Sequence, residues 1–320
     1  MIDFSQIKAI TIPEGIVNQI SRGVELLWRK VGFEYTGDFA ESSVEIDGAP
    51  YTLYTLTTSG LLTVYGDGIR FWMCGSGAGG KNTVESHTVV VERGYYYDTG
   101  NGGGGGYVAS GDLKAGEWAV VIGAGGPSNA DGNATSISAG KTAYSADGGK
   151  VSGAGGSGGG SGLKCDHYRS TAVSVKSLNN QGKGAGVSTY PFGLTELFAH
   201  CPGGGGGSGW AYAGSSSQDT VNNGGNGGTN GGNGSGGGTE RKSYDYTTLT
   251  TPGGTGGVKG GGNGGGVTYN ASAAYATGKN ASFYGSGAGG GAYYRKYSDT
   301  QRIGTGGIGY QGVVYIAVPA

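Results

Sequence analysis

Residues 223–229 read Asn-Gly-Gly-Asn-Gly-Gly-Thr, and residues 253–257 read Gly-Gly-Thr-Gly-Gly. Both stretches repeat glycines around single polar residues with a local period of three. In all, 77 of the 320 residues are Gly, and most lie between Cys74 and Gly312. Collagen would require Gly at every third position with abundant Pro, and neither condition holds. A left-handed polyglycine II helix also has three residues per turn, and its N–H and C=O groups point outward. Because facing glycines carry no Cβ, several such rods can pair side by side, and the sequence predicts this packing.

A flexible tether is the alternative interpretation of the glycine-rich block. Against it, segments containing Tyr, Trp and Val interrupt the glycines. The chain also closes on residues 313–318, a run without Gly that predicts a strand buried on both faces. A tether has no need to return to a strand, so we expect an ordered block.

Apolar and β-branched runs outside the block predict further strands. They are residues 7–12, 16–20, 24–28, 51–56, 61–65, 69–74 and 118–122. The first three predict a small N-terminal β-hairpin module over residues 1–30, residues 31–50 read as a linker, and residues 51–320 form the glycine-rich domain. The predicted fold class is mainly β, with β-sandwich-like strands framing packed polyglycine II helices.

Composition narrows the function classes. Charged residues are 13% of the chain and the formal net charge is −1, which argues against nucleic acid as a partner. No apolar run approaches the length of a membrane span, so we expect no membrane insertion. Residues 1–4 lack the basic and apolar start of a secretory signal. Three Cys are too few for disulfide bonds to stabilise a domain of this size.

Two motifs suggest chemistry. Residues 75–80 satisfy the dinucleotide pattern G-x-G-x-x-G, but a chain so rich in Gly matches it by chance, and the β-branched residues that follow do not predict the required helix. Cys165, His167, His200 and Cys201 have the donor types of a tetrahedral zinc site. Their spacing is unusual for zinc, so two reduced cysteines and two surface histidines near the base of a loop remain the alternative. We expect no enzymatic activity and no cofactor.

The 22 tyrosines are the most informative polar feature, because many gather in islands between glycine stretches. Tyr with Ser, Asn and Gly is the composition of adaptable recognition loops, in which each ring offers apolar area and a hydroxyl. Some of these rings could instead cover the glycine rods as a substitute core. The candidate receptor-binding residues are Tyr95, Tyr96, Tyr97, Tyr168, Tyr190, Trp210, Tyr212, Tyr244, Tyr246, Tyr293, Tyr294 and Tyr297.

Several of these stretches resemble a known family. Residues 54–64, residues 69–72 leading into 75–80, residues 102–126 and residues 309–316 resemble the glycine-rich domain of bacteriophage tail proteins. Residues 10–15 with Leu26-Leu27-Trp28 look like a short N-terminal module of phage virion proteins. The alternation of glycine stretches and islands is similar in architecture to the fibre-tip adhesins of T-even-like phages.

The resemblance implies a non-catalytic virion protein of the tail, baseplate or fibre, made in the bacterial cytoplasm. It implies recognition of a host-surface glycan or protein through the Tyr-rich loops, and attachment to other tail or baseplate proteins through the N-terminal module. A homotrimer is compatible with it, since tail tips are often trimeric. The alternative is a purely structural tail or baseplate component whose islands contact other virion proteins.

Overall fold

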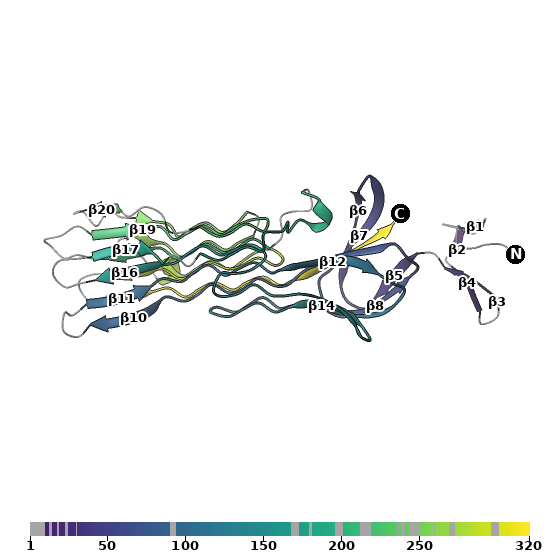
Figure 1. Cartoon of the computed structure of the whole chain (residues 1–320), viewed down its shortest axis with the longest axis horizontal. Helices are drawn as coiled ribbons and strands as arrows, with labels where there is room; N and C mark the ends of the chain where they lie inside the picture. The colour runs from purple at the N-terminus through teal and green to yellow at the C-terminus, as the bar shows by residue number, and fades with distance from the viewer. Residues whose placement is uncertain are drawn as a thin grey trace.

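The computed structural model is elongated, with a β-sandwich at one end, a glycine-rich middle and a second group of β-sheets at the other end (Figure 1). It describes residues 10–12, 15–17, 19–22, 25–29, 31–89, 94–167, 173–178, 181–195, 201–211, 219–235, 237, 241–243, 250–258, 260–268, 273–295 and 301–320, with side chains for most of them. This architecture confirms the predicted mainly β fold.

The sandwich consists of two five-stranded antiparallel sheets. The first has the order β12-β9-β25-β7-β6, formed by Val108–Leu113, Ile69–Cys74, Val313–Pro319, Ala49–Leu56 and Phe39–Ile46. The second has the order β15-β14-β13-β8-β5, formed by Thr142–Ala146, Thr135–Ala139, Gly116–Val121, Gly60–Tyr65 and Gly32–Tyr35. The last strand of the chain, β25, therefore lies at the centre of the first sheet.

Strands β9 and β25 are apolar on both faces because each face covers a different core. Phe71 and Met73 of β9 point between the two sheets, where they pack with Ile316 of β25 and Trp118 of β13. The alternate residues of the two strands belong to a second cluster on the outer face of the first sheet. Its buried members are Ile46, Leu53, Trp72, Cys74, Cys201, Val313, Tyr315 and Ala317.

The predicted linker over residues 31–50 is wrong. This region forms β5, which pairs with β8, and β6, which pairs with β7. The error arises because β6 is an edge strand whose residues are mostly exposed, so its sequence is polar and carries no strong apolar alternation.

Before the sandwich, the backbone of the predicted N-terminal module forms two short hairpins. Strand β1 (Ile10–Ile12) pairs with β2 (Gly15–Val17), and β3 (Gln19–Arg22) pairs with β4 (Glu25–Arg29). These hairpins lie beside the sandwich, at the end of the molecule away from the second group of sheets (Figure 1).

The glycine-rich segments continue the sandwich strands directly. Residues 75–83 follow β9, residues 99–107 lead into β12, and residues 304–312 lead into β25. They run side by side along the middle of the molecule (Figure 1) and form neither α-helix nor β-strand. The ends of the sandwich strands thus determine where these rods start.

Hydrogen bonds between the rods repeat every three residues. The N–H groups of Gly75, Ala78 and Lys81 donate to residues 107, 104 and 101 of one neighbour. The intervening residues donate elsewhere, because 76 and 79 reach carbonyls of residues 133 and 130, whereas 77 and 80 reach those of 310 and 307. A β-strand alternates between two directions, so a rotation through three neighbours is a different packing.

The same rotation extends through the rods at the centre of the block. The rod 99–107 donates to the segments 157–163, 285–291 and 147–150, and accepts from 75–81 and 204–207. The predicted ordered packing of glycine segments is therefore present in the described residues. The polyglycine II backbone conformation remains a prediction, supported by this period of three.

Glycine is required here because backbone faces backbone. A Cβ at Gly204 would overlap the carbonyl group of Ala288, and one at Gly77 would overlap that of Ser286. A few small side chains do fit in the block, among them Ala78 and Ala288, which are fully buried. Side chains are thus excluded only where the next rod is closest.

Asparagine side chains complete the hydrogen bonding at several positions along the rods. The Oδ1 atom of Asn226 accepts the N–H of Thr255 at 2.9 Å, and that of Asn263 accepts the N–H of Gly256 at 2.8 Å. Asn101, which is buried, accepts the N–H of Gly162 at 2.7 Å. The side-chain amide thus takes the place of a neighbouring peptide group, which gives the polar residue of the glycine repeats a structural role.

Beyond the glycine block, the rods continue into two further sheets. One has the order β10-β11-β16-β17, formed by Val84–Val89, Gly94–Asp98, Leu163–His167 and Val173–Ser177. The other has the order β20-β19-β18-β23-β24, formed by Arg241–Ser243, Asp219–Asn222, Gly209–Ala211, Tyr293–Arg295 and Gln301–Ile303. Strands β16 and β17 contact β18 and β19, so the two sheets adjoin. The remaining described elements are a two-stranded sheet of β21 (Thr250–Thr251) and β22 (Val267–Thr268), the single helical turn α1 (Ala273–Ala276) and the 3₁₀ turn Pro191–Gly193.

Candidate functional site

The distal sheets bring the ends of several strands together at the pole opposite the sandwich. Gly94 pairs with Val89 and Tyr95 with His167, so the β10–β11 and β16–β17 hairpins turn at the same end. In the other sheet, Ala211 pairs with Thr220. Asp219, the residue before Thr220, pairs with Ser243. Strand β23 runs parallel to β18, which brings Arg295 to that end as well. Figure 1 shows the labelled strands of both sheets at this pole.

Four Tyr-containing islands connect to strands at this pole. Each begins directly after a described strand end: 168–172 after β16, 212–218 after β18, 244–249 after β20 and 296–300 after β23. Their candidate residues Tyr168, Tyr212, Tyr244, Tyr246 and Tyr297 lie outside the described residues. Islands that are distant in the sequence therefore start from strand ends at the same pole of the molecule. No sequence pattern predicted this convergence.

Two candidate tyrosines are buried and belong to the core of the distal sheets. Tyr97 is 2% exposed and Tyr293 is 0% exposed, and their rings stack with centroids 4.0 Å apart and planes 14° apart. They pack with the buried side chains of Leu163 and Cys165. Neither ring is available to a ligand, so their prediction as receptor-binding residues is wrong. They match the alternative prediction, in which some tyrosine rings form a substitute core.

For four other candidates the structure describes the backbone. Tyr95 and Tyr96 lie in β11, Trp210 lies in β18 and Tyr294 lies in β23, all within the distal sheets. They are therefore close to the same pole as the islands.

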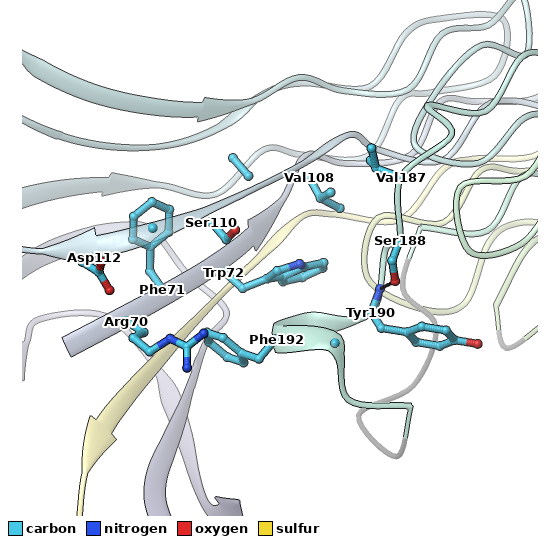
Figure 2. A pocket seen from close by; sticks show the side chains of 13 residues that line it. Arg70, Phe71, Trp72, Val108, Ser110, Asp112, Val187, Ser188, Tyr190 and Phe192 are labelled. Carbon is cyan, nitrogen blue, oxygen red and sulfur yellow. Dashed lines mark hydrogen bonds between the residues drawn. The ribbon is translucent and has the colours of Figure 1, made fainter. Parts of the chain in front are cut away.

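Tyr190 lies apart from the other candidates, beside a hollow at the junction of the sandwich and the glycine block. The hollow has a volume of about 760 Å³, and Figure 2 shows its lining side chains. Strand pairing explains its floor: Asp112 is opposite Arg70 and Ser110 is opposite Trp72, and directly opposed residues of an antiparallel pair point to the same face. This is the outer face of the first sheet, away from the core between the sheets.

The segment around the 3₁₀ turn Pro191–Gly193 forms the other wall of the hollow. Phe192 has a left-handed backbone, with φ of 52°, and its ring lies 5.7 Å from the guanidinium carbon of Arg70. Arg70 also donates to Asp47 across 2.8 Å, and this hydrogen bond raises the pKa of the guanidinium. Arg70 is thus held in position by a carboxylate and an aromatic ring of the protein itself.

The neighbouring residues of that wall are tied to the glycine block through Asn230. Its Oδ1 atom accepts from the hydroxyl of Ser188 and from the N–H of Thr189, each at 2.9 Å. Tyr190 follows directly and is half-buried, so its position is fixed by the block. The sequence predicted Tyr190 as a receptor-binding candidate, but it gave no indication of the sheet face that the residue adjoins.

The cysteines do not form the metal site considered from the sequence. Cys165 lies in the distal core with Tyr97, whereas Cys201 lies in the outer cluster of the sandwich with Trp72. Neither is in a disulfide. The side chain of His167 and the whole of His200 are outside the described part of the chain. Across that part, no group of three or more His, Cys, Asp or Glu side chains is arranged to hold a metal ion.

No known protein family matches the chain, and no curated protein matches it either. Among the helices that the structure describes, none has the length and apolar character needed to cross a bilayer.

Proposed function

We propose that this chain is a non-catalytic component of a phage tail that binds the host-cell surface through its distal pole. The observation that carries the proposal is the convergence of four Tyr-containing islands on neighbouring strand ends at that pole. Their Tyr, Ser and Asn content suits a glycan or a protein loop as ligand.

The glycine block supports this proposal physically. A recognition surface binds more tightly when its parts are held in place before the ligand arrives. Each rod is hydrogen-bonded to several others along its length, so the strand ends at the pole are fixed relative to one another. Such a block has no need of a large aliphatic core.

The two β-hairpins β1–β2 and β3–β4 lie at the opposite end and are the proposed attachment to other tail or baseplate proteins. The proposal places the protein in the virion tail after its synthesis in the bacterial cytoplasm. A homotrimer and a host-surface glycan or protein as ligand are parts of the same proposal. The alternative is a purely structural component, in which the distal islands contact other virion proteins.

The test is binding of the purified chain to cells of the host bacterium. We expect Tyr168→Ser, Tyr212→Ser and Tyr297→Ser each to weaken binding about tenfold or more, since aromatic hot spots cost about 2 kcal/mol or more when removed. Tyr310→Ser is the matched control, because Tyr310 is 38% exposed but lies in the glycine block.

Normal binding by all three variants, together with failed tail assembly, would favour the structural alternative. A larger change, the replacement of residues 239–252 by a short linker, would also remove the island 244–249, but point substitutions are preferable. That replacement would delete β20 and β21, and a folding defect would then be mistaken for lost recognition.

A further inference from the structure

Two cysteines that are far apart in the sequence meet at the junction of the sandwich and the glycine block. Cys74 ends strand β9, and Cys201 opens the rod 201–208. Both are fully buried in the outer cluster of the sandwich, beside Trp72 and Val313. Their thiols lie close enough to interact with each other.

Gly285 shows how closely the two sulfur atoms approach. A Cβ built on Gly285 would lie 2.6 Å from the Cys201 sulfur and 2.9 Å from the Cys74 sulfur. Both sulfur atoms therefore lie against one side of the same glycine. The absence of a side chain at this position leaves room for the pair.

The backbone at Cys201 is a second, independent observation. Its φ is +64°, a left-handed conformation that residues other than Gly seldom adopt. Pro202 follows it, and a residue before proline normally favours an extended backbone. An unfavourable conformation at the residue that brings one thiol to another is the kind of strain that accumulates at functional positions.

We propose that Cys74 and Cys201 are a cross-linking site that forms a disulfide once the protein meets an oxidising environment. The oxidant is a low-molecular-weight disulfide such as oxidised glutathione. One protein thiolate attacks it and releases one glutathione thiolate, and the second protein thiolate then displaces the other. Two protein thiols are oxidised to one disulfide while one oxidised glutathione is reduced to two molecules of glutathione.

The burial of the pair determines when this reaction can occur. Burial and the contact with Cys74 raise the pKa of the Cys201 thiol, so the reactive thiolate is scarce in the folded protein. We therefore expect slow oxidation of the native chain and fast oxidation during refolding. An extracellular setting for the protein rests on the proposed function, but the reaction itself does not.

The experiment is refolding of the full chain in oxidised or reduced glutathione, followed by thiol counting and peptide mapping without reduction. We expect the cross-linked Cys74–Cys201 peptide pair to be lighter by two hydrogen atoms than the sum of the two reduced peptides, with Cys165 still reduced. The midpoint of thermal unfolding should rise by on the order of 5 °C relative to the reduced protein, because the bond closes a long loop.

Variants separate this pairing from general oxidation. Cys165→Ser should keep the cross-link and the stabilisation, whereas Cys74→Ser and Cys201→Ser should abolish both. Three free thiols in the wild-type chain after oxidative refolding, or a disulfide that includes Cys165, would overturn the proposal. That result comes from the wild-type protein, so it stands even if a variant fails to fold, and it leaves host binding untested and the proposed function unaffected.

Discussion

In the middle of the molecule, the atoms opposite individual glycines explain why no other residue fits at those positions. Gly204 faces the carbonyl group of Ala288, and the N–H of Gly204 itself donates to the carbonyl of Gly103 at 2.8 Å. A methyl group at this position would push apart two rods that both hold further neighbours. The entropic cost of glycine is therefore offset by close backbone contact.

Gly204→Ala should destabilise the protein by about 3 kcal/mol or more, because the methyl group meets backbone and not a movable side chain. The free energy of unfolding in urea measures the effect. The control is Gly32→Ala, since a Cβ at Gly32 has no atom within 4 Å. Equal stability of the two variants would contradict backbone contact as the reason for glycine.

The hydrogen bonds that asparagine side chains make to the rods can also be tested by the free energy of unfolding. Asn101→Ala leaves the N–H of the buried Gly162 without its acceptor and should cost about 1–3 kcal/mol. Asn280→Ala removes an equivalent bond to the N–H of Ile308, but at an exposed side chain, where water can replace it. We expect the exposed variant to lose less than about 1 kcal/mol in the same unfolding measurement.

At the scale of elements, the sequence predicted the strands that are apolar on both faces and missed those that are exposed. Strands β9 and β25 were found because each covers two clusters, so successive residues on both faces had to be apolar. Strand β6 was missed because it is an exposed edge. The period of three in the glycines predicted lateral packing, but not which rod lies beside which, since that depends on where β9, β12 and β25 end.

The same limit applies to the candidate site. Composition identified the Tyr-rich islands, but it could not separate Tyr97 and Tyr293, which stack in the core, from tyrosines at strand ends. Burial depends on pairing across the sheets, and the pairing joins residues that are far apart in the sequence. The hollow beside Tyr190 was missed for the same reason.

Tyr35 links strand β5 to the turn before β8 and gives the sandwich a pH dependence. Burial, and to a lesser extent the nearby Asp38, raise the pKa of Tyr35 to about 12 from its ordinary value of 10.0. Its hydroxyl donates to the carbonyl of Thr58. Because the folded state favours the protonated ring, this contribution to stability is complete below pH 10 and is lost as the pH rises toward 12.

We expect the thermal midpoint of the wild-type protein to fall more steeply between about pH 10 and 12 than that of Tyr35→Phe. Differential scanning calorimetry across that window measures the two slopes. Tyr275→Phe is a suitable control, because Tyr275 is 39% exposed and lies in α1, outside the sandwich. Parallel slopes for wild type and Tyr35→Phe would show that other groups control the alkaline transition.

At the scale of the whole molecule, the chain closes on itself. Strand β25 comes from the last residues of the chain, yet it pairs with both β7 and β9 in the first sheet. Residues 304–312, which lead into it, are hydrogen-bonded to the rods 75–80 and 285–292. The sandwich therefore cannot be completed until the whole glycine block has been synthesised.

Truncation after Gly312 should abolish folding although it removes only β25 and the terminal residue, because the first sheet loses its central strand. Far-ultraviolet circular dichroism and resistance to protease measure the loss. Removal of Ala320 alone should be tolerated, since that residue is exposed and follows the strand. A protease-resistant truncated chain would show that the sandwich folds without its last strand.

The lateral bonding of the rods also determines how the molecule carries a mechanical load. A tensile force between the distal sheets and the sandwich would act along the rods and across their hydrogen bonds. Neighbouring rods could then slide only by breaking many of these bonds at once, whereas a hairpin pulled open from its turn breaks them one after another. By this geometry, the molecule resists tension through shear, and the load is shared among all the rods that end in the sandwich.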